Sequence, residues 1–349
     1  MQIQSHSHVI SSVLKWLKED EPVWLCSITK TWGSSPTPAG TLMAYCKKHG
    51  VAGTLSGGCI EEDLLEKMQL GTLLINQNKQ QFPIEMIYGG SQEEQSKFVL
   101  PCGGQLHILV EYLHATLEVI EHFSSLEYFL HQREIIGRKV AVHSGEITLL
   151  TENIQRGISR VAECSVQNKN QNFTDTTNAK EKVYIEHIMG PAYQMLLIGA
   201  SEVARCVAEL ALSLDFEVSV WDHREEFIRN WQVQNVEVYQ GSPEKLINEK
   251  FTDENNAIIA LAHDPRVDDF ALVDALSTKA FYIGAIGSKN TCRKRRERLV
   301  NYVGPPELLD KMHSPVGIDI GSKTPFEIAI SVMAHVIQKR SELEKSLNK

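Results

Sequence analysis

The stretch Gly53-Thr-Leu-Ser-Gly-Gly-Cys-Ile-Glu61 holds three glycines and stands directly before a run with helical periodicity. Its adjacent pair, Gly57 and Gly58, permits positive φ angles and a close approach of the backbone to a ligand. Apolar residues then recur at helical spacing, at Ile60, Leu64, Leu65 and Met68. The sequence therefore predicts a loop that becomes a helix at Cys59.

Cys59 would place a thiol at the start of that helix. Unpaired N–H groups and the positive end of the helix dipole favour an anion there, and so favour the thiolate. Glu61, Glu62 and Asp63 oppose ionisation of the thiol, so the direction of its pKa shift stays open. The alternative interpretation is a tight turn with a small buried cysteine and a well-capped helix.

Two further glycine motifs flank this stretch. Gly33-Ser-Ser-Pro-Thr-Pro-Ala-Gly40 precedes it, between predicted strands at 22–29 and 41–46. Pro101-Cys102-Gly103-Gly104 follows it and enters a predicted strand over 104–112. Cys102 would then lie in a second ligand-facing loop. A glycine-assisted bulge with an inert thiol is the alternative for that position.

The three motifs, in this order, resemble the N-terminal signature of the XdhC/CoxI family, the xanthine dehydrogenase accessory factors. The resemblance runs over nearly the whole chain apart from its middle, and the family also carries a C-terminal Rossmann-like domain. It implies an accessory protein for the maturation of a molybdenum hydroxylase. Such a protein binds molybdenum cofactor, assists the exchange of an oxo ligand for sulfur, and delivers the cofactor to the apo-enzyme. A cysteine desulfurase is then the expected sulfur donor.

The resemblance also implies which residues act. The candidates for catalysis are Cys59, Glu61 and Cys102, with Cys59 also a possible molybdenum contact through the bound cofactor. The candidates for holding the cofactor in the first domain are Ser34, Ser35, Gly57, Gly58, Gly103 and Gly104. A persulfide on Cys59 and a thiolate bound to molybdenum are both chemically reasonable. A third route passes sulfur directly to the bound cofactor, with Glu61 as the nearby acid or base.

Bulk composition bounds the class of protein. The chain has 349 residues, of which 42% are hydrophobic and 23% charged, as in a soluble globular protein of two domains. A net charge of −9 argues against nucleic-acid and anionic-membrane partners. No stretch reaches the ~20 apolar residues of a membrane span. The first twenty residues lack the features of a signal peptide, and seven cysteines without zinc spacing predict a reduced, cytoplasmic protein with no structural metal.

A polar stretch over 165–182 has too few apolar residues to build a core. It predicts an N-terminal domain at 1–164, a polar linker with a return strand at 165–190, and a C-terminal domain at 191–349. The fold class is α/β: a mixed α+β domain of the XdhC/CoxI type followed by a Rossmann-like domain with a parallel sheet.

The second domain has the element order of a dinucleotide fingerprint. A strand at 194–199 runs at Gly199 into a helix, and the next strand ends at Asp222, a spacing that suits a carboxylate reaching ribose hydroxyls. Ser201 stands where the fingerprint has its second glycine, and Glu202 adds negative charge near the phosphate position. A Rossmann-like scaffold without a dinucleotide therefore competes with a working NAD(P) site.

Ligands of parallel sheets bind beyond the carboxyl ends of the strands. The other cofactor-binding candidates predicted near this edge are Arg224, His263, Gly287, Ser288 and Lys323. His263 with Asp264 is equally well interpreted as a helix cap, and the basic run over 289–298 as a solvated helix face. Thr324, Pro325 and Glu327 predict a capping box at the last helix. That helix is strongly apolar and predicts packing on the sheet or across a homodimer contact.

Two other functions compete with maturation of a molybdenum enzyme. One is an NAD(P)-dependent oxidoreductase that uses the second domain for its cofactor and the first for its substrate. The other is an assembly chaperone without catalysis, in which neither Cys59 nor Cys102 is needed.

Overall fold

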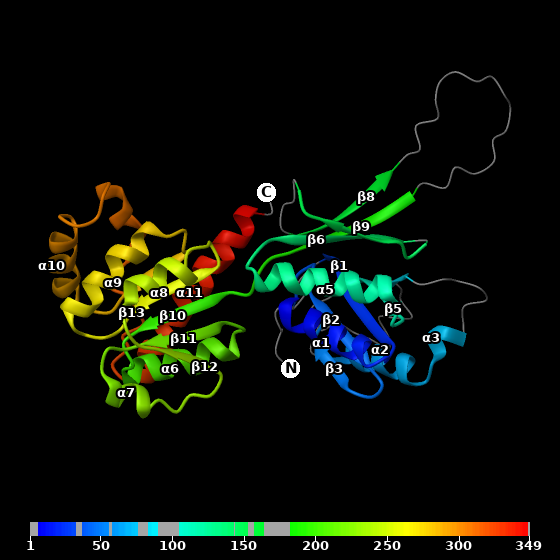
Figure 1. Cartoon of the computed structure of the whole chain (residues 1–349), viewed down its shortest axis with the longest axis horizontal. Coiled ribbons are helices and arrows are strands. Elements are labelled where there is room, and N and C mark those ends of the chain that lie inside the picture. Colours follow the sequence, from blue (N-terminus) through cyan, green and yellow to red (C-terminus); the bar gives the residue numbers. More distant parts are fainter. Residues whose placement is uncertain are drawn as a thin grey trace, which may run out of the picture. The chain divides into compact units, whose positions relative to one another are not determined.

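A computed structural model describes residues 6–32, 37–55, 58–75, 83–89, 105–142, 144–152, 157–163 and 182–347. The chain divides into two compact units, Met1–Pro191 and Ala192–Lys349 (Figure 1). Within the described ranges, no helix is both long enough and apolar enough to cross a bilayer.

The first unit is built on a five-stranded antiparallel sheet of order β3-β2-β1-β5-β4. Its strands are β1 Val23–Trp32, β2 Leu42–Cys46, β3 Gly50–Gly53, β4 Ile84–Tyr88 and β5 Gln105–Leu113. The central strand, β1, is buried at successive positions from Val23 to Ile28 because both faces of the sheet are covered.

Side chains that alternate along β1 enter two different cores. Leu25 packs with α1 His6–Lys18 and α5 Leu117–His131 on one face. Cys26 packs with α2 Cys59–Gln69 on the other face, where Ile60, Leu64 and Met68 are buried. The apolar periodicity that predicted a helix after Cys59 is therefore the face of α2 that holds it on the sheet.

A second antiparallel sheet of the first unit has the order β7-β6-β9-β8. Its strands are β6 Ile136–Ala141, β7 Ile147–Leu150, β8 Gly157–Glu163 and β9 Lys182–Met189. Arg138 of β6 donates two hydrogen bonds, of 3.0 and 2.8 Å, to the Glu111 carboxylate of β5, and both side chains are buried. The two hydrogen bonds compensate part of the cost of burying these charges, and the pair connects β6 of the second sheet to β5 of the first.

The second unit contains a six-stranded parallel sheet of order β12-β11-β10-β13-β14-β15. Its strands are β10 Gln194–Ile198, β11 Glu217–Trp221, β12 Val236–Tyr239, β13 Asn256–Ala260, β14 Tyr282–Ala285 and β15 Met312–His313. The run Met195–Ile198 is fully buried, as expected of a parallel strand covered on both faces.

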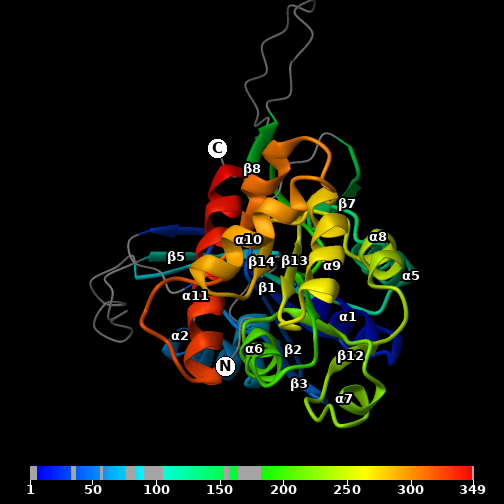
Figure 2. The ribbon, with the colours of Figure 1, turned by 90° about the vertical axis from the view of Figure 1, so that its left-hand side faces the viewer.

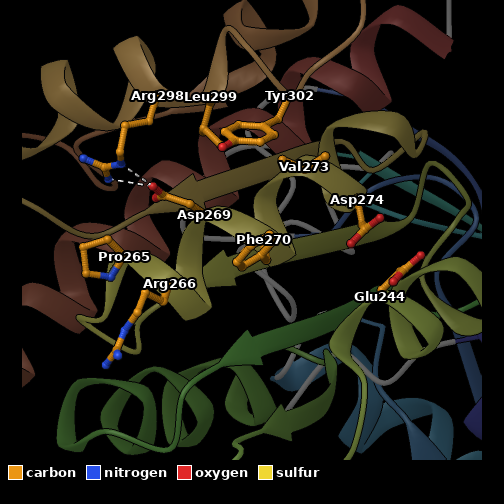
Figure 3. Close-up of a pocket in the computed structure, with 10 residues that line it drawn as sticks. All are labelled: Glu244, Pro265, Arg266, Asp269, Phe270, Val273, Asp274, Arg298, Leu299 and Tyr302. Carbon is orange, nitrogen blue, oxygen red and sulfur yellow. Dashed lines mark hydrogen bonds and ion pairs between the residues drawn. The ribbon is translucent and has the colours of Figure 1, made fainter.

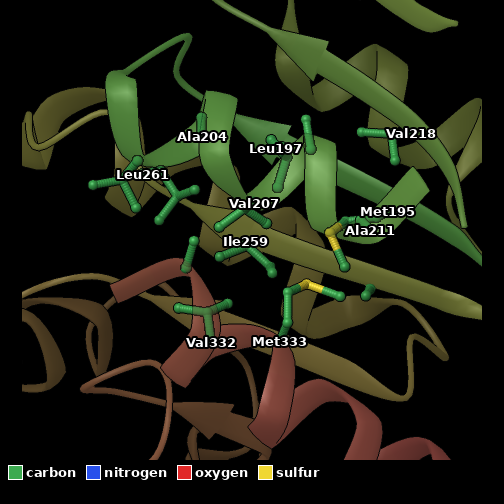
Figure 4. Packing of buried hydrophobic residues seen from close by; sticks show 14 of the residues in the cluster. Met195, Leu197, Ala204, Val207, Ala211, Val218, Ile259, Leu261, Val332 and Met333 are labelled. Carbon is green, nitrogen blue, oxygen red and sulfur yellow. The ribbon is translucent and has the colours of Figure 1, made fainter. Parts of the chain in front are cut away.

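Helices cover both faces of this sheet (Figure 2). One face carries α6 Glu202–Ser213 and α11 Pro325–Leu347, and Figure 4 shows Val332 and Met333 of α11 directed at the core. The other face carries α8 Pro243–Lys250, α9 Pro265–Ser277 and α10 Lys289–Leu299. Two short helices, α7 Glu225–Arg229 and a 3₁₀ helix Pro306–Lys311, complete the unit. The predicted fold class is confirmed.

Most predicted elements are present, and one is wrong. The sequence also predicts a strand over residues 71–75, and this prediction is wrong, because the segment forms a short helix, α3 Thr72–Ile75. The run of three apolar residues at 73–75 is too short to show a period that separates helix from strand. The capping box of α11 is confirmed: Thr324 accepts a 3.3 Å bond from the Glu327 N–H, and Glu327 accepts a 3.0 Å bond from the Thr324 N–H.

Candidate functional site

The loop-to-helix junction at Gly58 is the centre of the candidate site in the first unit. The helix α2 starts at Cys59, and Gly58 is its N-cap, exposed and without a side-chain oxygen to accept from the first turn. The first N–H groups of a helix have no partner inside the helix, and they attract anions together with the helix dipole. This junction is therefore suited to an anionic group of a ligand or to a thiolate.

Glu61 stands in the first turn of α2 but does not face the junction. Its carboxylate accepts hydrogen bonds from the Thr54 hydroxyl and from the Leu55 N–H, in the loop that leads to the glycine pair. The side chain is buried, with 4% of its surface exposed. Thr37, in the middle of the first glycine motif, donates to the Leu55 carbonyl. Glu61 thus anchors the loop, and Thr37 ties the loop to the first glycine motif.

Asp63 is also neutralised locally. Its carboxylate pairs with Lys67 at 2.6 Å and accepts a 2.7 Å hydrogen bond from the Tyr88 hydroxyl. Glu62 is exposed to solvent. Glu61 is therefore hydrogen-bonded, Asp63 is paired with Lys67, and Glu62 is hydrated. Their charges repel an anion at the helix N-terminus less than three free carboxylates would.

Several predicted residues lie outside the described part of the chain, namely Ser34, Ser35, Gly57, Cys102, Gly103 and Gly104. The backbone of Cys59 is placed as the first residue of α2, but its side chain is not described. The cysteines whose side chains are described, Cys26, Cys46, Cys206 and Cys292, are all buried. Burial raises the pKa of the Cys26 thiol strongly, with a smaller contribution from Glu111, so this thiol is inert.

The end of the first glycine motif is held by histidines. His6 of α1 hydrogen-bonds the Gly40 carbonyl at 2.9 Å. The ring of His187, from β9, meets the His6 ring edge to face at 5.2 Å between centroids. Burial, followed by the charges of His6 and Arg138, holds the pKa of His187 well below its usual value, so this ring is neutral at physiological pH. Sequence reasoning missed this pair because its members are 181 residues apart in the chain.

Gly199, the predicted first glycine of the dinucleotide fingerprint, has a packing reason to be glycine. Its φ is +103°, and a Cβ added there would lie 2.5 Å from the Cα of Ala262, which follows β13. The turn after β10 must therefore pass close to the neighbouring segment. No bound phosphate is needed to account for this glycine.

Asp222, at the end of β11, has its carboxylate engaged within the protein. Oδ2 accepts 2.7 Å bonds from the Ala200 N–H and from Arg224 Nη2, and Oδ1 accepts from the N–H and Nε of Arg224 at 2.8 and 3.0 Å. Burial alone would raise the pKa of this carboxyl, but these hydrogen bonds more than offset it and lower the pKa. A ribose hydroxyl would have to compete with Arg224 for a side chain that is 1% exposed.

The start of α6 is also occupied where a pyrophosphate would bind. The Ser201 hydroxyl accepts a 3.2 Å bond from the Ala204 N–H and so caps the helix itself. Glu202 follows it, exposed and paired with Arg205 at 2.6 Å. A capped helix end with a carboxylate in its first turn, beside an engaged Asp222, does not fit the usual mode of dinucleotide binding.

The remaining predicted residues of the second unit are in local contacts. Asp264 caps α9 through the Arg266 N–H at 2.9 Å, while His263 beside it is exposed and has a φ of +59°. Ser288 caps α10 through the Thr291 N–H at 3.2 Å, and Gly287 directly precedes this cap. Asp264 lies close enough to His223 and Arg224 to interact with them electrostatically, so the carboxyl ends of β11 and β13 are near each other. Lys323 belongs instead to the capping box of α11, where its backbone N–H donates to Glu327 at 2.8 Å and its side chain is exposed.

One member of the basic run is not on a solvated face. Arg295 is 2% exposed and binds Asp268 and Asp269 at 3.0 Å each, and it also donates to the Ile286 carbonyl at 2.8 Å. It joins α9 and α10 beneath the carboxyl edge of the sheet. The interpretation of the run as a solvated face is therefore wrong at this position.

Comparisons with known proteins agree with the two units. A model described as "XdhC and CoxI family" matches residues 16–79, and one described as "XdhC Rossmann domain" matches residues 195–336. The chain belongs to the XdhC and CoxI family. The first match includes the Gly53–Glu61 stretch, and the second covers the parallel sheet from β10 to α11.

Relatives match along the full length of this XdhC and CoxI family member. A Bacillus subtilis protein, named as a probable xanthine dehydrogenase subunit, is 28% identical, over 94% of this chain and 96% of its own. An Escherichia coli protein named "Molybdenum cofactor insertion chaperone PaoD" is 22% identical, over 97% of this chain and 90% of its own. A crystal structure of a Bacillus halodurans protein described as a xanthine dehydrogenase has a TM-score of 0.70 at 23% identity, covering 95% and 96% of the two chains. The last similarity establishes the fold.

Proposed function

We propose that this chain is a maturation protein for a molybdenum hydroxylase. In this proposal it binds molybdenum cofactor, assists its sulfuration and delivers it to the apo-enzyme, with a cysteine desulfurase as sulfur donor. The names of the two full-length relatives support a role around such an enzyme. The binding of an NAD(P) cofactor is disfavoured by the engaged Asp222 and the self-capped α6.

The observation that carries the proposal is the uncapped start of α2 at Gly58 and Cys59, with the nearest acid turned away. Molybdenum cofactor carries a phosphate, and its metal favours soft or protonatable groups nearby. A helix N-terminus with exposed glycine fits the anionic part, and a thiol at the first helical position fits the metal end. When bound, the cofactor supplies the molybdenum centre at which oxo is exchanged for sulfur.

The residues of the chain have distinct parts in this proposal. Gly57, Gly58 and the first N–H groups of α2 bind the anion. Cys59 and Cys102 are the candidate thiols, either for carrying sulfur or for contacting the metal. Glu61 is assigned a positioning part, since its carboxylate fixes the loop that leads to Gly57. Ser34, Ser35, Gly103 and Gly104 are proposed to line the same receptacle.

The test is to purify the protein from cells grown with molybdate and to identify any bound pterin, and its sulfur content, by mass spectrometry. Wild-type protein is expected to retain the pterin, and Cys59→Ala to lose at least about tenfold in retention or in sulfur content. Cys164→Ala, which lies outside the glycine motifs, is the matched control. Retention and client maturation that are normal in both Cys59→Ala and Cys102→Ala would favour a chaperone without thiol chemistry. NAD(H) binding with turnover, and no pterin, would contradict the proposal.

A further inference from the structure

An open groove lies on the outer side of α9 in the second unit, with a volume of about 460 Å³ (Figure 3). It runs from Arg266 to Asp274, which is about 12 Å along the helix at 1.5 Å per residue. The side chain of Glu244 borders it from α8, and Leu299 and Tyr302 border it from the end of α10. The groove is thus formed by helices of one unit alone.

Two aromatic side chains dominate the groove. Phe270 is 69% exposed and Tyr302 is 70% exposed, although both stand beside buried core residues of the sheet face. Val273 and the buried Leu299 also line the groove, so its middle is apolar. Large aromatic side chains left together in solvent mark a surface that another molecule covers. A small ligand would leave most of both rings in water, whereas a helix laid along α9 would cover both.

The charges at the two ends of the groove differ in how they are neutralised. At one end Arg298 pairs with Asp269 at 2.6 Å, and Arg266 pairs with Asp264 at 2.9 Å. At the other end the Asp274 and Glu244 carboxylates point toward each other (Figure 3). Burial and the charge of Glu244 raise the pKa of Asp274, although Asn248 hydrogen-bonds it. In the part of the chain that the structure describes, neither acid has an ion pair with a basic side chain. The unbalanced charge of the groove is therefore negative.

We propose that this groove docks an amphipathic helix of the client apo-enzyme, with apolar side chains on Phe270 and Tyr302 and a lysine or arginine between Glu244 and Asp274. The proposal rests on the proposed function for the identity of the partner. Charge complementarity fixes the kind of helix: a single cation satisfies both acids, and an acidic helix is repelled. The exposed residues of this chain's own basic helix, α10, are polar except at Val300, so a second copy docking that helix would leave the aromatic strip uncovered.

The experiment uses the full-length protein and the purified apo-form of the molybdenum hydroxylase whose activity is lost when this chain is deleted. Dissociation constants are measured by biolayer interferometry at low and high salt. Phe270→Ser is expected to weaken the complex at least about tenfold. The double variant Glu244→Gln/Asp274→Asn is expected to weaken it by a similar factor at low salt, with a smaller effect at high salt.

Leu117→Ser is the matched control, because Leu117 is 80% exposed in the first unit, outside the groove. It is expected to leave the dissociation constant unchanged. Thermal unfolding and pterin retention are expected to match wild type in all these variants, since Phe270, Glu244 and Leu117 are exposed and Asp274→Asn keeps the size of a half-buried side chain. A change in retention would assign the groove to cofactor binding and overturn the docking proposal.

The remaining outcomes separate the two proposals. If wild-type protein binds the apo-enzyme and every groove variant binds equally well, the groove proposal is overturned and the proposed function stands. If Phe270→Ser instead breaks a homodimer seen by analytical ultracentrifugation, a second copy is the occupant and the proposal is wrong. If wild-type protein retains no pterin and no hydroxylase depends on it, both proposals fail.

Discussion

Glu61 shows how one carboxylate can serve a binding site without facing it. In sequence it is an acid two residues after a candidate thiol, and so a natural candidate for proton transfer. In the structure its oxygen accepts from Thr54 and Leu55, so it holds the loop in front of its own helix. The negative charge that would repel an anion at the helix N-terminus is thereby turned toward hydrogen-bond donors.

Glu61→Ala is expected to lower the free energy of unfolding by about 1–3 kcal/mol, because it leaves a buried hydroxyl and a buried N–H without their acceptor. Loss of pterin retention should accompany it if the loop forms the receptacle. Urea unfolding followed by circular dichroism measures the first effect, and mass spectrometry the second. Glu62→Ala, at the exposed neighbouring position, should change neither by a measurable amount. Equal effects of the two variants would show that Glu61 has no anchoring part.

Residue roles were the least predictable feature from sequence. The helix start at Cys59 followed from glycines and periodicity, both of which are local. The partners of Glu61 and Asp222 did not follow, because a carboxylate looks the same in sequence whether it faces a ligand or a backbone N–H. The motif did contain a signal for Glu61, since Thr54 stands within the same Gly53–Glu61 stretch.

Elements of the second unit owe their spacing to close backbone packing. The turn after β10 passes so near Ala262 that only a residue without a Cβ fits at Gly199. The order strand, turn, helix, strand was predictable, because each part carries its own periodicity and turn residues. The packing role of Gly199 was not predictable, because a turn that binds phosphate and a turn that packs closely on Ala262 both require glycine. The burial of Arg295 was likewise not predictable from the sequence, because its partners Asp268 and Asp269 lie on another helix.

Gly199→Ala is expected to destabilise the protein by about 2–5 kcal/mol, from positive-φ strain of about 1–2 kcal/mol and overpacking of about 1–3 kcal/mol. Gly241→Ala is the control, because Gly241 has a similar φ of +94° with nothing near the added Cβ. Gly241→Ala should lose only the about 1–2 kcal/mol that comes from positive-φ strain. Guanidinium unfolding of both variants gives the difference. If the two variants lose the same amount, the close approach to Ala262 contributes nothing.

At the scale of the whole molecule, each unit contains a histidine whose pKa is lowered in the folded state, the buried His122 in the first unit and the half-buried His313 in the second. Burial, with the charge of Arg138, lowers the pKa of His122 to about 3, and burial, with His335, lowers that of His313 to about 4. The unfolded chain takes up protons at these positions near pH 6.5, whereas the folded chain does not. Folding is therefore favoured fully above pH 6.5, and stability is lost as the pH falls toward 4 and then 3.

The expected result is a urea midpoint that stays nearly constant above about pH 7 and drops steadily from about pH 6.5 to pH 5. Each fully buried histidine contributes up to about 1.4 kcal/mol for each pH unit. His122→Gln removes one such group and should flatten the curve, while the exposed His8→Gln should leave its slope unchanged. A midpoint that is constant over this range, or a slope equal in the two variants, would contradict the prediction.

The borders of the parallel sheet carry a further consequence. One outermost strand, β12, has four residues, and the other, β15, has two and runs directly into Ser314 and Pro315. A long unpaired strand edge is a template on which another chain can add, whereas a two-residue edge followed by proline offers almost no ladder to extend. The β15 edge of the sheet is therefore expected to resist edge-to-edge association with a second copy of the chain.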